Sequence, residues 1–440
     1  MTKLRVIELF SGIGAQRAAL NRLADKWDLE LEYVAQCEID KYAIKAYNAI
    51  FGETANLGDI TKVEKLPASD LVTYSFPCTS LSKAGHQKGM AKGSGNESAL
   101  LWEVERVLKA TPKEDLPEWL VMENVTQVHS KKFIKSFNEW IESLDKMGYD
   151  SAWCDLNSKD TGVAQNRNRT FMVSRLKEKG PVGALTPKKV RLKKVLRNYL
   201  EKGPVDAKYF LSEKQLERIL WRNKTNEEEG RGFTFLPRTE ESIANCITSR
   251  AGSRETDNFI MCEMVADLNT KGNLECSNRV YSINALCPTI NTGQGGGHMV
   301  KIAIEVPDKN GLKIIEGTKA GWSYAKDGDG LVLGFLTGSS PARGRVQKGL
   351  CPTLQTGINV AVVLKEDNDK YYVIRKLTPE ECWRLFGRTE EEIAIVRGIK
   401  ISDTQMYKLA GNGIVVDTLM AIFECMFGWD EKMNKKKRRT

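Results

Sequence analysis

Over the first 175 residues, apolar runs alternate with segments in which apolar residues recur every three or four positions. A continuous apolar run, such as residues 4–10, predicts a buried strand, and the helical spacing at 15–24 predicts an amphipathic helix. Further strands are expected at 31–37, 70–76, 119–123, 149–156 and 171–173, and further helices at 41–50, 97–109 and 131–147. This alternation predicts an α/β fold whose largely parallel sheet is covered on both faces and binds ligands at the carboxyl ends of its strands.

The pattern changes after about residue 176. A basic segment at 187–204 leads into a stretch rich in Gly, Thr, Ser and Asn with short strand-like runs, which predicts a small, loop-rich β-domain. This stretch holds a weak internal repeat, RVYSINALCPTINTG from Arg279 and RVQKGLCPTLQTG from Arg345. A fainter copy, CITSRAG, begins at Cys246.

Helical spacing returns at Arg375 and is followed by a predicted turn at 411–413 and an apolar helix at 415–427. A chain of 440 residues is too long for one small core, so two domains of unequal size are expected. The expected order is a first domain over 1–178, a second over 179–373, a return to the first over 374–428 and a basic tail over 429–440.

The composition is that of an ordinary soluble globular protein, with 41% hydrophobic and 28% charged residues. Because no long apolar run or signal peptide is found, we expect a cytoplasmic protein with reduced thiols. Ten cysteines without a CxxC pair and only three histidines argue against a zinc ribbon, and no metal site is expected. The net charge of +9 suits either a polyanionic partner or an ordinary basic enzyme. The basic tail fits a solubilising segment better than a phosphate-binding arm.

The first predicted strand leads into ELFSGIGA, at 8–15, where Gly12 and Gly14 precede a helix. Glycines let the backbone approach a ligand, and a helix N-terminus offers N–H groups, although a plain tight turn has the same pattern. Glu38, after the second strand, is placed to hold a ribose diol, and Asp59 could accept from an adenine amine. Either carboxylate alone could be a helix cap, but together with the glycine turn they favour a cofactor that carries adenosine.

Three later motifs carry groups suited to covalent chemistry. SFPCTSLS places Cys78 directly after a proline at a strand exit, where an accessible thiolate is a strong nucleophile. MENV places Glu123 at the end of an apolar strand, where a partly desolvated acid can keep a proton and pass it to a ring nitrogen; Asn124 beside it could instead be a helix N-cap. QNRNR sets Arg167 and Arg169 two positions apart, facing the same way if they lie on one strand.

In this order, ELFSGIGA, CEID, GDI, SFPCTSLS, MENV, QNRNR, RKLTPEECWRLFG and LAGNGIVVDTLMAI resemble the motifs of the cytosine-5 DNA methyltransferases. The resemblance covers residues 1–175 and about 375–427. It implies a Rossmann-like, S-adenosylmethionine-dependent methyltransferase fold, with the insert as a smaller β-rich target recognition domain. It also implies that the enzyme flips a cytosine out of double-stranded DNA and methylates its C5. We expect a monomer with no membrane association, of prokaryotic or phage type, acting in a restriction system beside a cognate endonuclease.

The resemblance also implies roles for single residues. Cys78, as thiolate, would add to C6 of cytosine, and Glu123 would protonate or hydrogen-bond N3. Asn124 would order the turn at Pro77, Arg169 would contact the base carbonyl or the cysteine loop, and Arg167 would support it. The residues expected to bind S-adenosylmethionine are Phe10, Gly12, Gly14, Glu38, Ile39, Asp59, Ile60, Pro77, Leu100, Asn412 and Ile414. The residues expected to contact DNA are Ser82, Lys88, Arg250, Arg279, Thr289, Thr292, Gln294, Arg343 and Thr353.

The chain departs from the family pattern at several positions. Ala15 stands where a glycine is common, Ala164 where a proline is usual and Gly413 where a serine is frequent, and LFGRTEEEI lacks the usual Phe-Pro or Tyr-Pro after its glycine. The CPT repeats fit structural turns better than base readers.

The alternative that the chain is a nicotinamide-dependent oxidoreductase leaves Cys78 and Glu123 unexplained, and an inactive relative is disfavoured because both are present. An RNA cytosine methyltransferase of the same fold stays an alternative, although its Cys-Phe-Thr signature is missing.

Overall fold

The computed structural model describes residues 2–81, 88–202, 205–211, 213–229, 237–249, 251, 258–267, 279–282, 301–303, 312–315, 322–325, 330–333, 345–347, 359–362 and 371–437. The chain forms two compact units. The first consists of Met1–Leu200, Glu240–Asn258 and Leu377–Thr440, and the second of Glu201–Thr239 and Phe259–Lys376. Residues 179–200 and 240–258, inside the range expected for the target recognition domain, therefore group with the first unit. The role of that range in DNA recognition stays a prediction.

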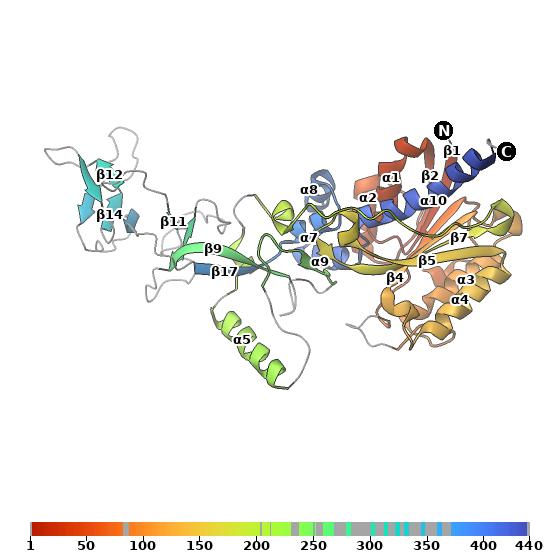
Figure 1. Ribbon diagram of the computed structural model, residues 1–440, viewed down its shortest axis with the longest axis horizontal. Coiled ribbons are helices and arrows are strands. Elements are labelled where there is room, and N and C mark those ends of the chain that lie inside the picture. The colour runs from red at the N-terminus through yellow and green to blue at the C-terminus, as the bar shows by residue number, and fades with distance from the viewer. Residues whose placement is uncertain are drawn as a thin grey trace. The chain divides into compact units, whose positions relative to one another are not determined.

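The first unit is built on a six-stranded sheet (Figure 1). Its strands, in spatial order, are β2 (Leu29–Cys37), β1 (Thr2–Leu9), β3 (Leu71–Tyr74), β4 (Trp119–Val125), β7 (Asn168–Leu176) and β5 (Tyr149–Asn157). The pairs β2–β1, β1–β3 and β3–β4 are parallel, whereas β7 runs antiparallel to both of its neighbours. The predicted, largely parallel sheet is therefore confirmed, and the carboxyl ends of β1 to β4 share one edge.

Helices cover both faces of this sheet (Figure 1). On one face, α3 (Leu101–Ala110) and α4 (Ile134–Lys146) pack on a core that includes Val72 and Leu120. On the other face, α1 (Ala15–Leu23) and α10 (Val416–Lys437) pack on a core that includes Leu71 and Val121. Successive strand residues thus belong to opposite cores, which is why these strands read as continuous apolar runs.

The remaining helices of the first unit are α2 (Lys41–Phe51), α7 (Pro379–Leu385), α8 (Glu390–Gly398) and α9 (Asp403–Asn412). Their starts follow local capping chemistry: the Asp40 side chain accepts from two backbone N–H groups at the start of α2, and Thr378 and Thr389 form capping boxes at α7 and α8. A short strand, β6 (Gln165–Asn166), pairs in parallel with β8 (Ala244–Asn245) and brings residues 244–249 to the first unit.

The described part of the second unit is a set of short strands with one helix, α5 (Glu213–Glu228). One sheet has the order β11 (Lys301–Ala303), β10 (Arg279–Ser282), β9 (Phe259–Asp267) and β17 (Tyr371–Lys376). A hairpin pairs β12 (Leu312–Ile315) with β13 (Trp322–Ala325), and a third sheet has the order β15 (Arg345–Gln347), β14 (Gly330–Leu333) and β16 (Asn359–Val362). The repeat segments that begin at Arg279 and Arg345 each start on one of these strands.

Three local expectations were wrong. The segment at Arg375 is the end of strand β17, and the next helix begins at Pro379. The expected turn at 411–413 is mostly helical, because α9 continues to Asn412 and only Gly413 lies beyond it. Helix α10 continues past Phe427 to Lys437. By length and composition alone the segment Asp403–Gly428 could cross a membrane, but 61% of its apolar 18-residue stretch is buried, as in the core helix of a globular protein.

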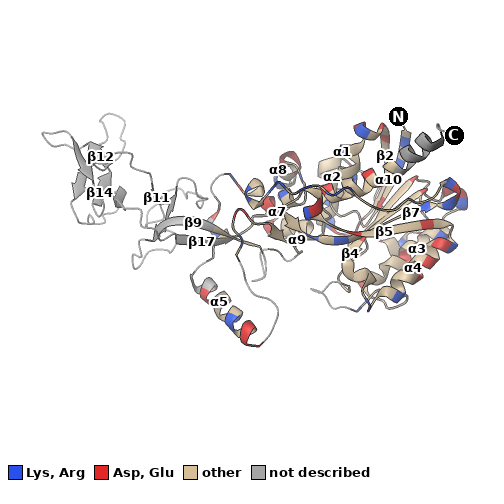
Figure 2. Cartoon of the chain, in the orientation of Figure 1, with Lys and Arg blue, Asp and Glu red and all other residues tan. Residues whose placement is uncertain are grey.

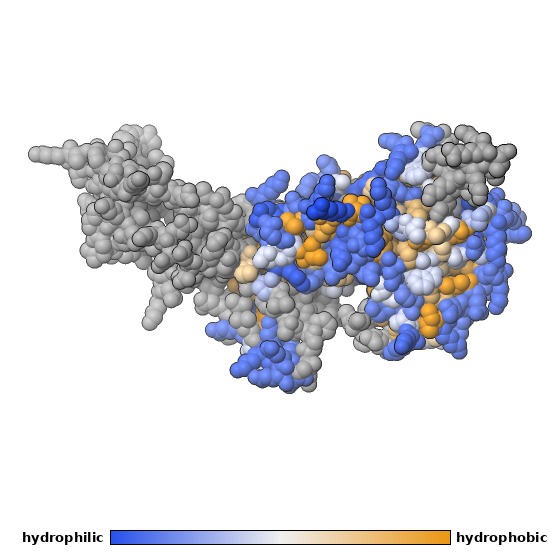
Figure 3. Space-filling model, viewed as in Figure 1, coloured by the Kyte–Doolittle hydropathy of each residue, from blue (hydrophilic) through white to orange (hydrophobic). Residues whose placement is uncertain are grey.

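Charged residues of both signs are interspersed over α3 and α4 (Figure 2). The visible face of the first unit is mainly hydrophilic, with apolar residues in small groups (Figure 3). The net charge of +9 is therefore not concentrated on these two helices.

Gly411 owes its place to packing rather than to a turn. A Cβ atom at this position would overlap the backbone of Thr248 and Ser249, which passes directly against the end of α9. We expect Gly411→Ala to lower the free energy of unfolding by about 1–3 kcal/mol, because backbone must move to admit the methyl group. Urea denaturation measures this loss.

Gly398→Ala is the matched control, since a Cβ on this helical glycine meets nothing within 4 Å. It should leave stability unchanged or raise it by up to about 1 kcal/mol. Equal stability of the two variants would contradict the close approach at Gly411.

Candidate active site

The loop after β3 carries Cys78 at the edge where the parallel strands end. Ser98 fixes this loop from both sides of the cysteine: its Oγ donates to the carbonyl of Pro77 at 2.7 Å and accepts from the N–H of Ser80 at 3.2 Å. The buried Asn124 at the end of β4 donates from Nδ2 to the carbonyl of Phe76 at 2.9 Å. Asn124 therefore acts on the backbone before Pro77, and the alternative that it is a helix N-cap was wrong.

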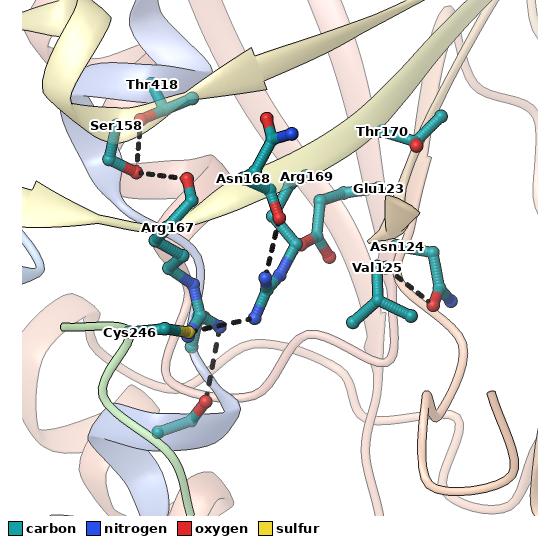
Figure 4. A network of polar contacts seen from close by, with 12 residues as sticks. Glu123, Asn124, Val125, Ser158, Arg167, Asn168, Arg169, Thr170, Cys246 and Thr418 are labelled. Atoms are coloured by element: carbon teal, nitrogen blue, oxygen red, sulfur yellow. Dashed lines mark hydrogen bonds and ion pairs between the residues drawn. The ribbon is translucent and has the colours of Figure 1, made fainter. Parts of the chain in front are cut away.

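Glu123 and Arg169 face each other from neighbouring strands. In the antiparallel register of β4 and β7, Glu123 lies opposite Phe171 and Arg169 opposite Val125, so the two are diagonal neighbours. Nε of Arg169 lies 3.2 Å from Oε1 of Glu123, and the two side chains are only 15% and 10% exposed (Figure 4). A carboxyl group and a guanidinium thus meet at the strand end, next to the cysteine loop.

Arg167 connects segments that are distant in sequence. It lies between β6 and β7, so the expectation that it shares a strand with Arg169 was wrong. Its buried guanidinium donates to the carbonyls of Ile247 at 2.9 Å, Gly411 at 3.2 Å and Gly413 at 2.7 Å. Three carbonyls from two other parts of the chain therefore meet on one side chain.

Two thiols share the electrostatic environment of these arginines. Burial raises the pKa of the Cys78 thiol above its ordinary value, and Arg169 and Arg167 offset only part of that effect. Burial also acts to raise the pKa of Cys246, but Arg167 and Arg169 outweigh it and leave that pKa below the ordinary value. The difference has a structural cause, because both guanidinium groups hydrogen-bond the Cys246 sulfur directly.

The turn after β1 has an unusual backbone. Phe10, Gly12 and Gly14 have φ values of 55°, 55° and 70°, in the left-handed region. A Cβ on Gly14 would lie 2.6 Å from the ring of Phe51, whereas a Cβ on Gly12 would meet nothing within 4 Å. The side of the turn at Gly12 therefore borders open space.

Glu38 is held beside that space. Its Oε2 accepts from the N–H of Gly12 at 2.9 Å, and its Oε1 accepts from the N–H groups of Ile39 and Asp40, both at 2.8 Å. Ile39 next to it is an apolar side chain that is 72% exposed. The carboxylate is thus fixed by backbone donors at the end of β2.

The other residues expected at the cofactor lie in varied surroundings. Asp59 caps the short helical turn Ile60–Lys62 by accepting from the N–H of Thr61 at 3.0 Å, as the alternative reading of this carboxylate predicted. Ile60 is buried in the core under α3, and Leu100 packs against the same core. Asn412, the last residue of α9, is exposed, whereas Ile414 is buried with α1 and α10.

Arg388 holds the glycine turn from the C-terminal segment. Its Nη2 donates to the carbonyl of Ile13 at 2.8 Å, and Nη1 reaches Glu392 at 3.4 Å. Arg22 of α1 donates in turn to the carbonyl of Gly387 at 2.7 Å. Residues that follow the insert therefore stabilise the turn after β1 through these hydrogen bonds.

Of the residues expected to contact DNA, Lys88 is exposed at the end of the cysteine loop. Arg279 is the first residue of β10, but its side chain is not described. The remainder lie outside the described residues: Ser82, Arg250, Thr289, Thr292, Gln294, Arg343 and Thr353. Within the described residues, no three His, Cys, Asp or Glu side chains gather as metal ligands.

The profile of the C-5 cytosine-specific DNA methylase family matches residues 4–428. The chain belongs to this family. It is 31% identical over 510 residues to the orphan methyltransferase M.Rho11sI of Bacillus phage rho11s, covering 96% of this chain and 98% of that one. It is 32% identical over 461 residues to the orphan methyltransferase M.SPRI of Bacillus phage SPR, covering 96% and 97%.

Among solved structures, the Entamoeba histolytica methyltransferase EhMeth superimposes with a TM-score of 0.57 at 16% identity, covering 97% of this chain and 99% of that one. At this identity the likeness shows the fold. The protein is thus an S-adenosylmethionine-dependent DNA cytosine-5 methyltransferase, and DNA is its substrate. The expected Rossmann-like methyltransferase fold is confirmed.

Sequence reasoning did not single out Ser98, Arg388 or Cys246 as parts of the site. The departure from the family pattern in LFGRTEEEI marked the position of Arg388, and the fainter repeat copy began at Cys246. No feature of the sequence marked Ser98, because its partners are backbone groups that only the fold brings near.

Ser98→Ala should displace the cysteine loop. The substitution leaves the Pro77 carbonyl and the Ser80 N–H without their partner, so we expect a loss of about 1–3 kcal/mol in unfolding free energy and a lower rate of methyl transfer. Denaturation and single-turnover kinetics measure the two effects.

Ser94→Ala serves as the comparison, because Ser94 is exposed and, among the described residues, its side chain bonds only that of Asn96. It should change stability by less than about 0.5 kcal/mol. A Ser98 variant as active and stable as this one would contradict the assigned role.

Proposed function

We propose that Cys78, Glu123 and Arg169 form the catalytic centre, with Cys78 as the nucleophile. The observation that carries the proposal is their convergence: a loop thiol, a strand-end carboxyl group and a buried guanidinium meet at the edge where β3, β4 and β7 lie side by side. The electrostatic influence of Glu123, Arg167 and Arg169 on the Cys78 thiol supports this closeness.

In the proposed reaction the target cytosine is flipped out of the duplex, because C5 and C6 cannot be reached inside the stack. The Cys78 sulfur adds to C6 after losing its proton, and Glu123 protonates or hydrogen-bonds N3. The ring then carries an enamine, which makes C5 nucleophilic. S-adenosylmethionine, when bound, supplies the electrophilic methyl group. Loss of the C5 proton and departure of the thiolate from C6 restore the aromatic ring.

Arg169 and Asn124 are proposed to position the target base and the nucleophile. The guanidinium beside Glu123 is placed to donate to the carbonyl of a base that approaches the carboxyl group. Asn124 holds the residue before Pro77, which limits the positions of the nucleophile. Arg167 supports Arg169 through its bonds to Ile247 and Gly413.

The turn after β1 is proposed to hold S-adenosylmethionine. The open space at Gly12, the fixed carboxylate of Glu38 and the exposed Ile39 fit an adenosine group, with Glu38 on the ribose and Ile39 against the base. The proposed binding set is the one expected from the sequence: Phe10, Gly12, Gly14, Glu38, Ile39, Asp59, Ile60, Pro77, Leu100, Asn412 and Ile414.

Recognition of the target sequence is proposed to lie in the insert between β7 and α7. Lysines outside the insert, such as Lys88, would contact phosphates, which strengthens binding at low salt without reading sequence.

We further propose a monomer in the cytoplasm. Pairing with a restriction endonuclease stays a prediction, and the name orphan methyltransferase given to the two phage relatives favours action without one.

Cys78→Ala should abolish methyl transfer and leave S-adenosylmethionine binding largely intact, since the thiol is needed only for addition to C6. Bisulfite sequencing of DNA from cells that express the chain identifies the methylated site. An oligonucleotide with 5-fluorocytosine at that site should then form a denaturant-resistant complex with the wild type and none with the variant. Cys154→Ser, at a thiol on β5, is the control and should trap normally. Substantial turnover by Cys78→Ala would contradict the assignment of Cys78 as the nucleophile.

Glu38→Gln should weaken S-adenosylmethionine binding roughly tenfold to a hundredfold, because a hydrogen bond to a charged group is replaced by a neutral one. Isothermal titration calorimetry measures the change. Glu53→Gln, at an exposed position after α2, is the matched control and should bind as the wild type does. Unchanged affinity in the Glu38 variant would remove this residue from the cofactor site.

A further inference from the structure

A second cysteine lies at the centre of the polar network around the catalytic strands. Cys246 follows β8, and its sulfur accepts hydrogen bonds from Nη1 of Arg167 at 3.4 Å and from Nη2 of Arg169 at 3.8 Å (Figure 4). The two guanidinium groups thus converge on this one atom. Cys246 is itself only partly exposed.

The charges of this network need a second anion. Arg169 has the carboxylate of Glu123 at 3.2 Å, but the other hydrogen-bond partners of Arg167 among the described residues are neutral carbonyl groups. Two buried guanidinium groups with one carboxylate would leave one positive charge uncompensated, which is costly away from water. A thiolate at Cys246 would supply the second negative charge.

The neighbouring thiol does not supply that charge. The groups that act on this network in the described residues are Arg167, Arg169, Glu123 and Cys78. Burial and Glu123 raise the pKa of Cys78, whereas the two arginines leave the pKa of Cys246 below its ordinary value. The pKa values of the two thiols are therefore shifted in opposite directions within one site.

We propose that Cys246 is a positioning residue for methyl transfer: its sulfur, as thiolate, holds the guanidinium of Arg169 against Glu123 and keeps Arg167 in the same network. The inference rests on the proposed roles of Glu123 and Arg169. Cys246 does not act as a nucleophile itself, because a sulfur stabilised by two guanidinium groups is a weak one.

The first test uses the wild-type protein. Alkylation with iodoacetamide is followed over a range of pH and resolved by mass spectrometry of the separate cysteine peptides. The pH midpoint for Cys246 should lie below the ordinary thiol value of about 8.5, and the midpoints for Cys78 and Cys154 above it. A Cys246 midpoint at or above that of Cys154 overturns the proposal without any variant.

The second test compares three variants whose melting temperature and S-adenosylmethionine affinity are measured beside the wild type. Cys246→Ser removes the charge and keeps the size, and should lower kcat roughly tenfold or more with KM little changed, since Arg169 loses its fixed geometry. Cys246→Asp restores an anion and should recover most of the loss. Cys154→Ser is the matched control and should behave as the wild type does.

The pH profile separates a charge effect from a loss of packing. Protonation of Cys78 lowers activity at falling pH in every variant; wild-type activity should show a further fall as the pH drops through the pKa of Cys246, because that thiolate is lost there. That acid limb should move to lower pH in Cys246→Asp, whose carboxyl group has an ordinary pKa of about 3.9. Full activity in Cys246→Ser, or equal losses in the serine and aspartate variants, overturns the proposal.

Trapping with 5-fluorocytosine DNA distinguishes this inference from the proposed catalytic mechanism. The Cys246→Ser protein should still form the covalent complex through Cys78, but more slowly. If Cys78→Ala formed the complex, the catalytic assignment would fail, whereas trapping by Cys246→Ser at the wild-type rate would overturn only the positioning role.

Discussion

Two largely buried guanidinium groups hold together the segments that form the proposed catalytic edge. Arg167 follows β6 and Arg169 is the second residue of β7, and a charged group without partners at that depth would destabilise the fold. Their partners come from β4, from the segment after β8 and from the end of α9. The arginines can be buried only when all three segments are in place, so the site and the fold form together.

This requirement explains why the chain returns to its first unit after a long excursion. Residues after Leu377 supply Gly411 and Gly413 as acceptors for Arg167, and Arg388 as donor to the glycine turn. Helix α10 also covers one face of the sheet. An N-terminal fragment alone would lack these partners and would expose the apolar residues that α10 covers.

The strands and helices of the first unit could be predicted from the sequence because apolar spacing is a local property. The strand-end positions of Cys78 and Glu123 followed from the same spacing, since ligand-facing groups gather where parallel strands end. Contacts between segments that are distant in the sequence produce no such local spacing of apolar residues. Cys246 resembles any other cysteine until β8 pairs with β6, and Gly411 suggested a turn because the close passage of Thr248 is visible only in three dimensions. Arg167 lies outside both strands because β6 ends at Asn166 and β7 starts at Asn168.

The chain passes from the first unit into the second and back twice. Each time, the backbone segments at which it departs and returns lie side by side in the first unit. Leu196 and Arg197 bond to residues 240–242 around the first excursion, and Leu377 donates to Asn258 around the second. The strands that begin and end that second excursion, β9 and β17, are paired antiparallel from their first residues. Each excursion is therefore closed at its base by paired backbone, apart from the six-stranded sheet. Such an arrangement lets the inserted sequence be lengthened, shortened or exchanged during evolution while the first unit keeps its own fold.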